Sequence, residues 1–253
     1  MKIGIVGFGR MGKLIREICL ERGHSIPLIV DPSAEPLPDG TTRANNAAEA
    51  DLALADTVID FSFPDGVIDN IHAYAEAGVA AVIGTTGWEA ERPGIRSLIE
   101  QKNATLLYGS NFSVGANLFF AMTEQLARLI NRFPQYDMLM HEFHHRHKKD
   151  SPSGTALTAA DRIMENLQRK TQVQRESLQR EIQPEELHVT ATRGGNFPGL
   201  HMVLADSAED TIELRHTARS RRGFALGAVL AAEWLQGKQG FYSFDDYFKE
   251  ALG

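Results

Sequence analysis

Twelve residues in the middle of the chain, from His144 to Thr155, combine imidazoles, amines and the start of a helix. An imidazole gains or loses a proton near neutral pH, and the ammonium of Lys148 adds a point charge and a transferable proton. Ser153 precedes an apolar-periodic helix, and the free amides of a helix start favour a carboxylate. The segment therefore predicts a catalytic site for an anionic substrate, although Ser153 also suits an ordinary helix cap.

Two other interpretations of this segment stay open. Imidazoles bind metals, and Asp150 or Glu142 could supply a carboxylate ligand. On a strand, however, His145 and His147 share one face while His144 points to the other. The chain also has a single cysteine, so thiolates cannot complete a zinc site, and we expect no metal. The third interpretation, a solvated basic face, does not account for the proline, glycine and threonine that follow.

A second pattern with chemical meaning lies near the N-terminus, where Gly7, Gly9 and Gly12 follow a short apolar strand and open a helix. The first glycine permits a tight turn, the second lets a pyrophosphate approach the backbone, and the third lets helix and strand pack closely. Asp31 ends the next strand about twenty residues further on, as a dinucleotide-binding turn requires. The pattern predicts a nicotinamide cofactor, and its alternative is a turn that needs only positive φ.

Asp31 bears on the choice of cofactor. Its carboxylate can accept hydrogen bonds from the adenosine ribose hydroxyls and repels a 2′-phosphate, which favours NADH over NADPH. Arg10 and Arg43 could weaken this preference by attracting the phosphate. Asp31 and Pro32 could also form no more than a turn at the end of the strand.

Two further loops follow later strands. They are Gly84, Thr85, Thr86 and Gly87, and Gly109, Ser110, Asn111 and Phe112. Loops at the carboxyl edge of a parallel sheet border the ligand crevice, so both could flank the nicotinamide. Each could equally be a tight turn.

These residues need a scaffold that brings strand ends together. Strands expected at 2–6, 26–30, 57–61, 79–83 and 105–108 alternate with helices expected at 11–22, 65–77 and 96–102. Such alternation predicts an α/β fold with a Rossmann-type, doubly wound parallel sheet.

The middle of the chain changes character and predicts a central α+β domain. Helices are expected at 115–132 and 153–169, and strands at 138–143, 188–193, 200–205 and 211–217. The last three strands are spaced for an antiparallel meander. An apolar helix at 224–235 and an aromatic-rich tail at 241–248 follow.

Composition narrows the classes of function. With 253 residues, 43% of them hydrophobic, the chain is long enough for two globular domains. The formal net charge of -7 argues against nucleic-acid binding, since phosphate contacts need a basic surface. Cys19 alone forms no intrachain disulfide, which fits a reducing cytoplasm. We see no targeting signal and no apolar run long enough to cross a membrane.

The segment HHRHKKDSPSGTA, residues 144–156, closely resembles the signature of the bacterial 4-hydroxy-tetrahydrodipicolinate reductases, formerly called dihydrodipicolinate reductases. The similarity covers nearly the whole chain and follows the order of the family's motifs. It includes GRMG at 9–12, GTTG at 84–87, NFSVGAN at 111–117, RGG followed by GLH within 193–201, and SRRGFALGAV at 220–229.

The resemblance implies a dinucleotide-binding domain at 1–110 and 223–253, and a domain at 111–222 that binds substrate and builds a homotetramer. It implies NADH- or NADPH-dependent reduction of 4-hydroxy-tetrahydrodipicolinate, a dicarboxylate, to tetrahydrodipicolinate in lysine and diaminopimelate biosynthesis. The implied catalytic residues are His144 and Lys148, and the implied substrate ligands are His145, Gly154 and Thr155. The implied cofactor contacts are Gly7, Phe8, Gly9, Arg10, Met11, Gly12, Asp31, Gly84, Thr85, Thr86, Gly109, Ser110, Asn111 and Phe112.

Two departures from the family pattern bear on the cofactor. Many members have one more residue in the glycine turn, whereas this chain has the tight form Gly7, Phe8, Gly9. Some members have an arginine directly after the acidic residue, where it can meet a 2′-phosphate, but Pro32 follows Asp31 here. We therefore expect both cofactors to be used, with a preference for NADH.

Overall fold

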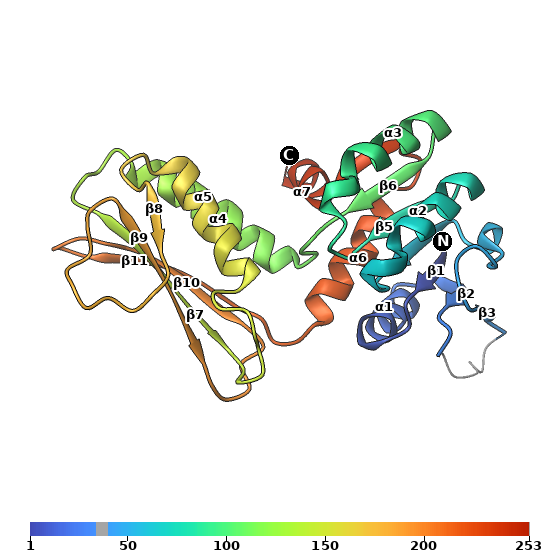
Figure 1. Ribbon diagram of the computed structural model, residues 1–253, viewed down its shortest axis with the longest axis horizontal. Helices are drawn as coiled ribbons and strands as arrows, with labels where there is room; N and C mark the ends of the chain where they lie inside the picture. The colour runs from blue at the N-terminus through green and yellow to red at the C-terminus, as the bar shows by residue number, and fades with distance from the viewer. Residues whose placement is uncertain (34–39, 253) are drawn as a thin grey trace. The chain divides into compact units, whose positions relative to one another are not determined.

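The chain folds into two compact units (Figure 1). A computed structural model describes residues 1–33 and 40–252. Unit 1 consists of Met1–Val114 and Arg221–Gly253, and unit 2 of Gly115–Ser220. The chain thus leaves unit 1 once and later returns to it. The boundaries expected from the sequence, after residues 110 and 222, fall close to these two points.

Within the described residues, unit 1 is built on one parallel sheet of seven strands in the order β3-β2-β1-β4-β5-β6-β12. The strands are β1 (Lys2–Val6), β2 (Ser25–Val30), β3 (Thr42–Ala44), β4 (Thr57–Asp60), β5 (Ala80–Ile83), β6 (Thr105–Tyr108) and β12 (Gly240–Ser243). The strand order reverses between β1 and β4. Parallel sheets of this kind bind ligands at the carboxyl ends of the strands beside such a reversal.

Helices cover both faces of this sheet, which confirms the doubly wound arrangement. They are α1 (Arg10–Glu21), α2 (Pro64–Ala77), α3 (Arg92–Lys102), α6 (Arg222–Trp234) and α7 (Phe244–Leu252), with short 3-10 turns at Leu52–Leu54 and Glu89–Glu91. One core joins α1, α6 and α7 to the sheet through residues such as Ile15, Val229 and Phe244. A second core joins α2 and α3 to the opposite face through Ile71 and Ile95. Burial on both faces explains why the strands are almost wholly apolar.

The C-terminal tail adds a strand that the sequence pattern does not predict. β12 pairs in parallel with β6, and Tyr242 lies opposite Leu107. The four residues of β12 are all half-buried, so the strand lacks the alternation that marks a strand in a sequence. The aromatic residues of the tail instead enter the core of unit 1, where Phe244 is buried.

Unit 2 holds a mixed sheet whose order is β11-β10-β7-β9-β8 in the described residues. Its strands are β7 (Asp137–His144), β8 (Gln172–Gln174), β9 (Glu186–Arg193), β10 (Leu200–Asp206) and β11 (Thr211–Thr217). β10 and β11 form the expected antiparallel pair. The prediction of a three-stranded meander is wrong, because β7 lies between β9 and β10, parallel to β9 and antiparallel to β10. The short connection from β9 to β10 passes β7 instead of forming a hairpin.

Two helices, α4 (Val114–Ile130) and α5 (Gly154–Asn166), pack over one face of this sheet (Figure 1). The buried face of β7 presents Met138 and Met140 to them. Helix α5 ends at Asn166, three residues earlier than expected. Arg169, which was expected to end the helix, instead donates hydrogen bonds to the carbonyls of Ile130 and Tyr136. No helix in the described residues is both long and apolar enough to cross a membrane.

The polar segment between α5 and β9 is held by a buried lysine. The ammonium of Lys170 lies 3.0 Å from the carbonyl oxygen of Pro184, 2.8 Å from that of Glu186 and 2.6 Å from Oδ1 of Asp137. A buried charge persists in a fold when its donors are satisfied in this way. The lysine therefore ties the segment to the edge of the sheet in unit 2.

Candidate active site

Strand β7 carries the first part of the predicted site and ends at His144. Its side chains alternate, so Glu142 and His144 lie on the buried face. His145 and His147 follow in a turn, and the expectation that they share a strand face is wrong. The strand ends here because the amide of His145 donates a hydrogen bond, 2.9 Å long, to the carbonyl of Phe197. Phe197 precedes β10, so this bond is not part of the pairing of β7 with β10.

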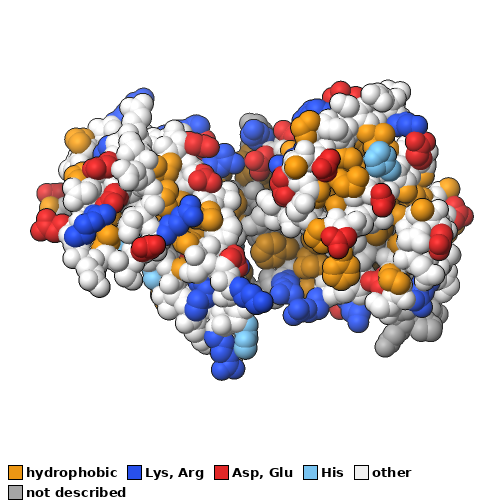
Figure 2. Space-filling view, viewed as in Figure 1, with side chains coloured by type: hydrophobic (Ala, Val, Ile, Leu, Met, Phe, Trp, Pro, Cys, Tyr) orange, Lys and Arg blue, Asp and Glu red, His pale blue; other side chains and the backbone are white. Residues whose placement is uncertain are grey.

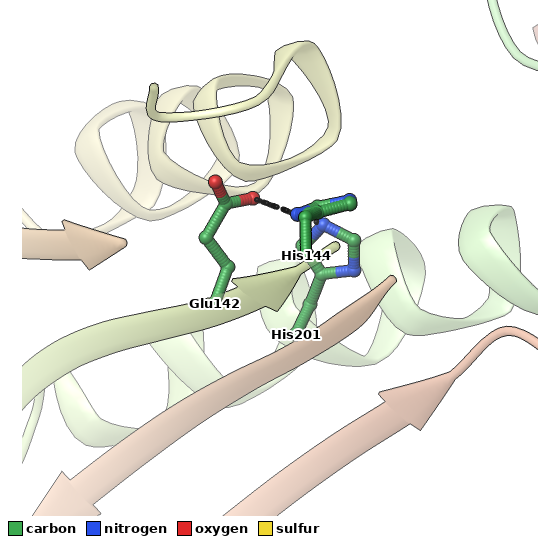
Figure 3. A group of neighbouring side chains, drawn as sticks. All are labelled: Glu142, His144 and His201. Carbon is green, nitrogen blue, oxygen red and sulfur yellow. Dashed lines mark ion pairs between the residues drawn. The ribbon is translucent and has the colours of Figure 1, made fainter. Parts of the chain in front are cut away.

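Glu142 is the centre of a buried polar network, part of which Figure 3 shows. Its Oε1 accepts hydrogen bonds from the amide of Ser153 and from Nη2 of Arg193, each at 2.8 Å. Its Oε2 accepts a hydrogen bond from the Ser153 hydroxyl. The same oxygen lies 3.4 Å from Nδ1 of His144 and 3.3 Å from Nε2 of His201. One carboxylate therefore joins β7, β9 and β10 to the start of α5.

These contacts keep Glu142 ionised. Burial by itself raises the pKa of a carboxyl group, because it disfavours the charged form. The adjacent imidazoles of His144 and His201 and the hydrogen bonds from Ser153 and Arg193 outweigh burial and hold the pKa of Glu142 well below its ordinary value. Glu142 is thus a fixed negative charge inside unit 2.

Glu142, His144 and His201 are also the three described residues whose ligand atoms lie close enough, within 4.8 Å of one another, to hold a metal ion. The carboxylate already accepts a guanidinium at 2.8 Å from Arg193. That positive charge disfavours a second cation on the same group. That the chain needs no metal stays a prediction. We expect the enzyme to keep its activity after dialysis against a chelator, and a loss of activity would contradict the prediction.

Arg193 and His201 join the site through strand pairing. Glu142 lies opposite His201 in β10, and His144 lies opposite Arg193 in β9. The sequence shows both residues only as parts of the RGG and GLH runs, and it offers Glu142 only as a metal ligand. His201, a polar residue in a mostly apolar run, is an available signal, but the contacts of both residues follow from a strand order that the sequence pattern does not give.

Lys148 and the start of α5 hold a carboxylate that belongs to the chain itself. Nζ of Lys148 lies 2.9 Å from Oδ1 of Asp150, and the amide of Gly154 donates a hydrogen bond to the same side chain. Burial tends to raise the pKa of Asp150, but the Lys148 ammonium and these hydrogen bonds lower it. Lys148 and the Gly154 amide therefore bind a carboxylate in this structure, that of Asp150.

Ser153 is the N-cap of α5, as expected. Its hydroxyl accepts a hydrogen bond from the amide of Ala156 at 3.2 Å. Gly154 opens the helix, and Thr155 follows in its first turn. A Cβ built at Gly154 would meet none of the described residues within 4 Å, so packing does not require a glycine there. A glycine at this position does leave the helix amides accessible to a ligand.

The remaining members of the histidine and lysine run lie outside the Glu142 network. Arg146, His147 and Lys149 are exposed, while His145 is half-buried with its ring 6.2 Å from that of His147. Figure 2 shows basic side chains and a histidine together at the lower end of unit 2, where the loop after β7 lies in Figure 1. These residues give the approach to the site a positive potential.

In unit 1, the glycine turn has the geometry that its pattern predicts. Gly7 has a φ of +83°, and a Cβ there would lie 2.4 Å from the carbonyl oxygen of Phe61. A Cβ at Gly12 would lie 2.2 Å from the carbonyl oxygen of Gly7. Gly9 differs, since its Cβ would meet none of the described residues within 4 Å. No described side chain caps the N-terminus of α1, so its amides can receive a phosphate.

Asp31 does more than end β2. Its Oδ2 accepts a hydrogen bond from the amide of Phe8 at 2.6 Å, and its Oδ1 accepts from the amide and the hydroxyl of Ser33, each at 2.7 Å. Burial tends to raise the pKa of Asp31, but the hydrogen bonds from Ser33 and Phe8 hold it below its ordinary value. The Arg43 side chain donates to the carbonyls of Asp31 and Pro32. A carboxylate thus lies beside the glycine turn, with a guanidinium next to it.

The two predicted loops follow β5 and β6, which are neighbours in the sheet. Asp60, at the end of β4, accepts a hydrogen bond from the Thr85 hydroxyl at 3.1 Å and so fixes the first loop. Asn111 accepts one from the amide of Ser113 at 2.9 Å, and the buried ring of Phe112 lies 5.8 Å from that of Phe61. Both loops line one pocket, whose residues include Thr85, Thr86, Trp88, Tyr108, Gly109 and Ser110.

Unit 1 has a doubly wound sheet with a glycine turn. Unit 2 has a carboxylate-binding site with acid–base side chains. Together these features define a dinucleotide-dependent oxidoreductase. Comparison with known proteins specifies the family. The family model described as dihydrodipicolinate reductase, N-terminus, matches residues 1–112, and the one described as dihydrodipicolinate reductase, C-terminus, matches residues 115–248. The chain belongs to the dihydrodipicolinate reductase family.

Individual relatives agree over the full length. The chain is 37% identical to the 4-hydroxy-tetrahydrodipicolinate reductase of Christiangramia forsetii, over 99% of this chain and 98% of the relative. It is 34% identical to that of Archaeoglobus fulgidus, over 98% and 100%. A dipicolinate-bound dihydrodipicolinate reductase from Paenisporosarcina sp. TG-14 shares the fold, with a TM-score of 0.80, 19% identity and coverage of 96% of this chain and 97% of that chain.

Proposed function

We propose that this chain reduces 4-hydroxy-tetrahydrodipicolinate to tetrahydrodipicolinate with a pyridine nucleotide, as a step of lysine and diaminopimelate biosynthesis. Its family supports this reaction. The observation that carries the proposal is the Asp150 carboxylate bound by Lys148 and the Gly154 amide. The substrate is a dicarboxylate, and the reductase from Paenisporosarcina binds dipicolinate, which is also one.

In the proposed reaction, a substrate carboxylate replaces that of Asp150. The Lys148 ammonium and the amides of Gly154 and Thr155 hold it, because they offer positive charge and N–H donors at the helix start. His145 binds the substrate from the turn after β7. His144 and Lys148 manage the proton that balances hydride arrival at ring carbon four, while the substrate hydroxyl leaves as water.

The residues of unit 1 fit a pyridine nucleotide, which supplies the hydride when bound. The uncapped start of α1 and the open space at Gly9 suit the pyrophosphate. We propose that Asp31 binds the ribose hydroxyls and that the loops after β5 and β6 flank the nicotinamide. The further contacts that we propose are Gly7, Phe8, Arg10, Met11, Gly12, Gly84, Thr85, Thr86, Gly109, Ser110, Asn111 and Phe112.

Both NADH and NADPH are expected to serve, with NADH preferred. The ionised Asp31 repels a 2′-phosphate, whereas the guanidinium of Arg43 beside it offsets part of that repulsion. Steady-state kinetics with each cofactor should therefore give a higher kcat/KM for NADH. A much lower kcat/KM with NADH than with NADPH would overturn the preference.

A coupled assay tests the reaction itself. The purified chain is mixed with NADH, pyruvate, aspartate semialdehyde and the synthase that condenses the two into the substrate. We expect NADH oxidation only when every component is present. Oxidation that does not depend on the synthase, or no oxidation at all, contradicts the proposed function.

The second unit also suits assembly into a homotetramer. The face of its sheet opposite α4 and α5 presents Leu139, Phe143, Met202 and Leu204, none of them fully buried. Such a face favours contact with another copy of the chain. Sedimentation velocity should give the mass of four chains, and a monomer would refute this assembly.

We expect the enzyme to act in the cytoplasm, which suits its single buried cysteine, Cys19.

A further inference from the structure

The buried carboxylate of Glu142 touches the proposed proton-transfer residue but has no role in the reaction as described so far. Glu142 and His144 are two residues apart on the buried face of β7 (Figure 3). Nδ1 of His144 is buried and lies 3.4 Å from Oε2 of Glu142, and it makes no hydrogen bond with any described residue in this structure. This separation is long, as such contacts often are before substrate binds.

The opposite edge of the same ring lies beside a glycine. A Cβ at Gly199 would lie 3.0 Å from Nε2 of His144, and Gly199 has a φ of +157°, which disfavours any side chain. Residue 199 therefore places no side chain against the Nε2 edge, while the Nδ1 edge faces the negative charge of Glu142. The two nitrogens of His144 lie in different chemical surroundings.

We propose that Glu142 is a positioning residue: its carboxylate accepts the Nδ1 proton of His144 and so directs Nε2 to the substrate. This inference rests on the proposed function. A carboxylate on one imidazole nitrogen fixes the tautomer and stabilises the charged ring that forms when the other nitrogen takes a proton.

The partners of Glu142 make it a firm anchor. Arg193 and the Ser153 amide hold Oε1, and His201 approaches Oε2 beside His144, with the two rings 5.2 Å apart. Because Ser153 caps α5, the same carboxylate also fixes the helix start that is proposed to bind the substrate. The buried carboxylate of Glu142 therefore positions both the proton-transfer residue and the helix start that is proposed to bind the substrate.

The test is a double-mutant cycle of Glu142→Gln and His144→Asn, assayed with substrate and NADH. Glutamine keeps the size of glutamate but removes its charge. We expect kcat to fall about 100-fold in Glu142→Gln, the scale of one acid–base residue. In the His144→Asn background the same change should alter kcat by no more than about twofold, because the proton-transfer imidazole that Glu142 positions is then absent. An equal loss in both backgrounds indicates a merely structural role and overturns the inference.

The control is His216→Asn. His216 lies opposite His201 in β11, with ring centroids 6.3 Å apart, and makes no contact with Glu142 in the described structure. This variant should keep the wild-type kcat, and a loss as large as that of Glu142→Gln argues against a specific role for the carboxylate. A wild-type enzyme without any reductase activity instead refutes the proposed function.

A second measurement needs no variant and decides the matter if Glu142→Gln does not fold. A neutron crystal structure of the wild-type chain locates the hydrogen isotope on the ring of His144. We expect it on Nδ1, directed at Oε2 of Glu142. A neutral ring that carries it on Nε2 alone overturns the inference.

Discussion

Replacing Lys148 with alanine should lower kcat/KM for the dicarboxylate substrate about 1000-fold, the combined scale of a lost proton donor and a lost charge–carboxylate contact. The reason is visible in the structure, where Nζ of Lys148 holds the Asp150 carboxylate at 2.9 Å. A neutral methyl group offers neither charge nor proton. Both a higher KM and a lower kcat are expected, because the ammonium serves binding as well as proton transfer.

Lys149→Ala is the matched control. Lys149 is the next residue, carries the same charge and is exposed. Its removal should change kcat/KM by no more than about twofold, as surface substitutions away from a site usually do. The side chain of Lys148 is itself 24% exposed and forms its ion pair with the exposed Asp150, not with a described core residue, so both variants should melt at the wild-type temperature. Near-normal turnover in Lys148→Ala removes the lysine from the mechanism.

The sheet of unit 1 could be predicted from the sequence because its signals are local. Buried strands such as β1 and β5 are short apolar runs, and their neighbours in space are mostly neighbours along the chain. Gly78, in the left-handed conformation, ends α2 where the pattern places the stop. The sequence pattern does not predict β12, because its partner β6 lies about half the chain away and its residues do not alternate.

The sheet of unit 2 shows where local signals fail. The spacing of β9, β10 and β11 resembles a meander, but spacing cannot show that β7 enters between β9 and β10. The pairing of β7 with β9 on one side and β10 on the other shows that it is a central strand. The error about the order of strands also hides the functional network, which depends on that order.

The candidate site divides in the same way. His144, Lys148 and Ser153 lie close together in the sequence, so their chemistry could be anticipated from residue types and from the helix start. The roles of Glu142 and His201 could not, because a contact across strands needs the register of β7 with β10. That register turns a residue first considered as a metal ligand into a hydrogen-bonded anchor.

Replacing Gly12 with alanine should lower the free energy of unfolding of the chain by roughly 3 kcal/mol, the upper end of overpacking effects, and the melting temperature by about 6–12 °C. Gly12 is in the first turn of α1, where alanine would otherwise stabilise a helix by about 1 kcal/mol. The new Cβ would lie 2.2 Å from the carbonyl oxygen of Gly7, and backbone cannot yield as a flexible side chain can. Thermal melting measures the loss, and Gly66→Ala in α2, where a Cβ meets no described residue within 4 Å, should lose nothing.

Gly9→Ala separates packing from cofactor binding within the same turn. Its Cβ would meet no described residue within 4 Å, and its φ of -74° suits alanine, so its melting temperature should match the wild type. If the pyrophosphate approaches the backbone here, the methyl group occupies that space and weakens NADH binding, by about 100-fold for a clash of roughly 3 kcal/mol. Fluorescence titration with NADH measures this loss. A Gly9→Ala chain that binds NADH like the wild type shows that the pyrophosphate does not approach Gly9, whereas one that also melts early shows that the glycine serves the fold.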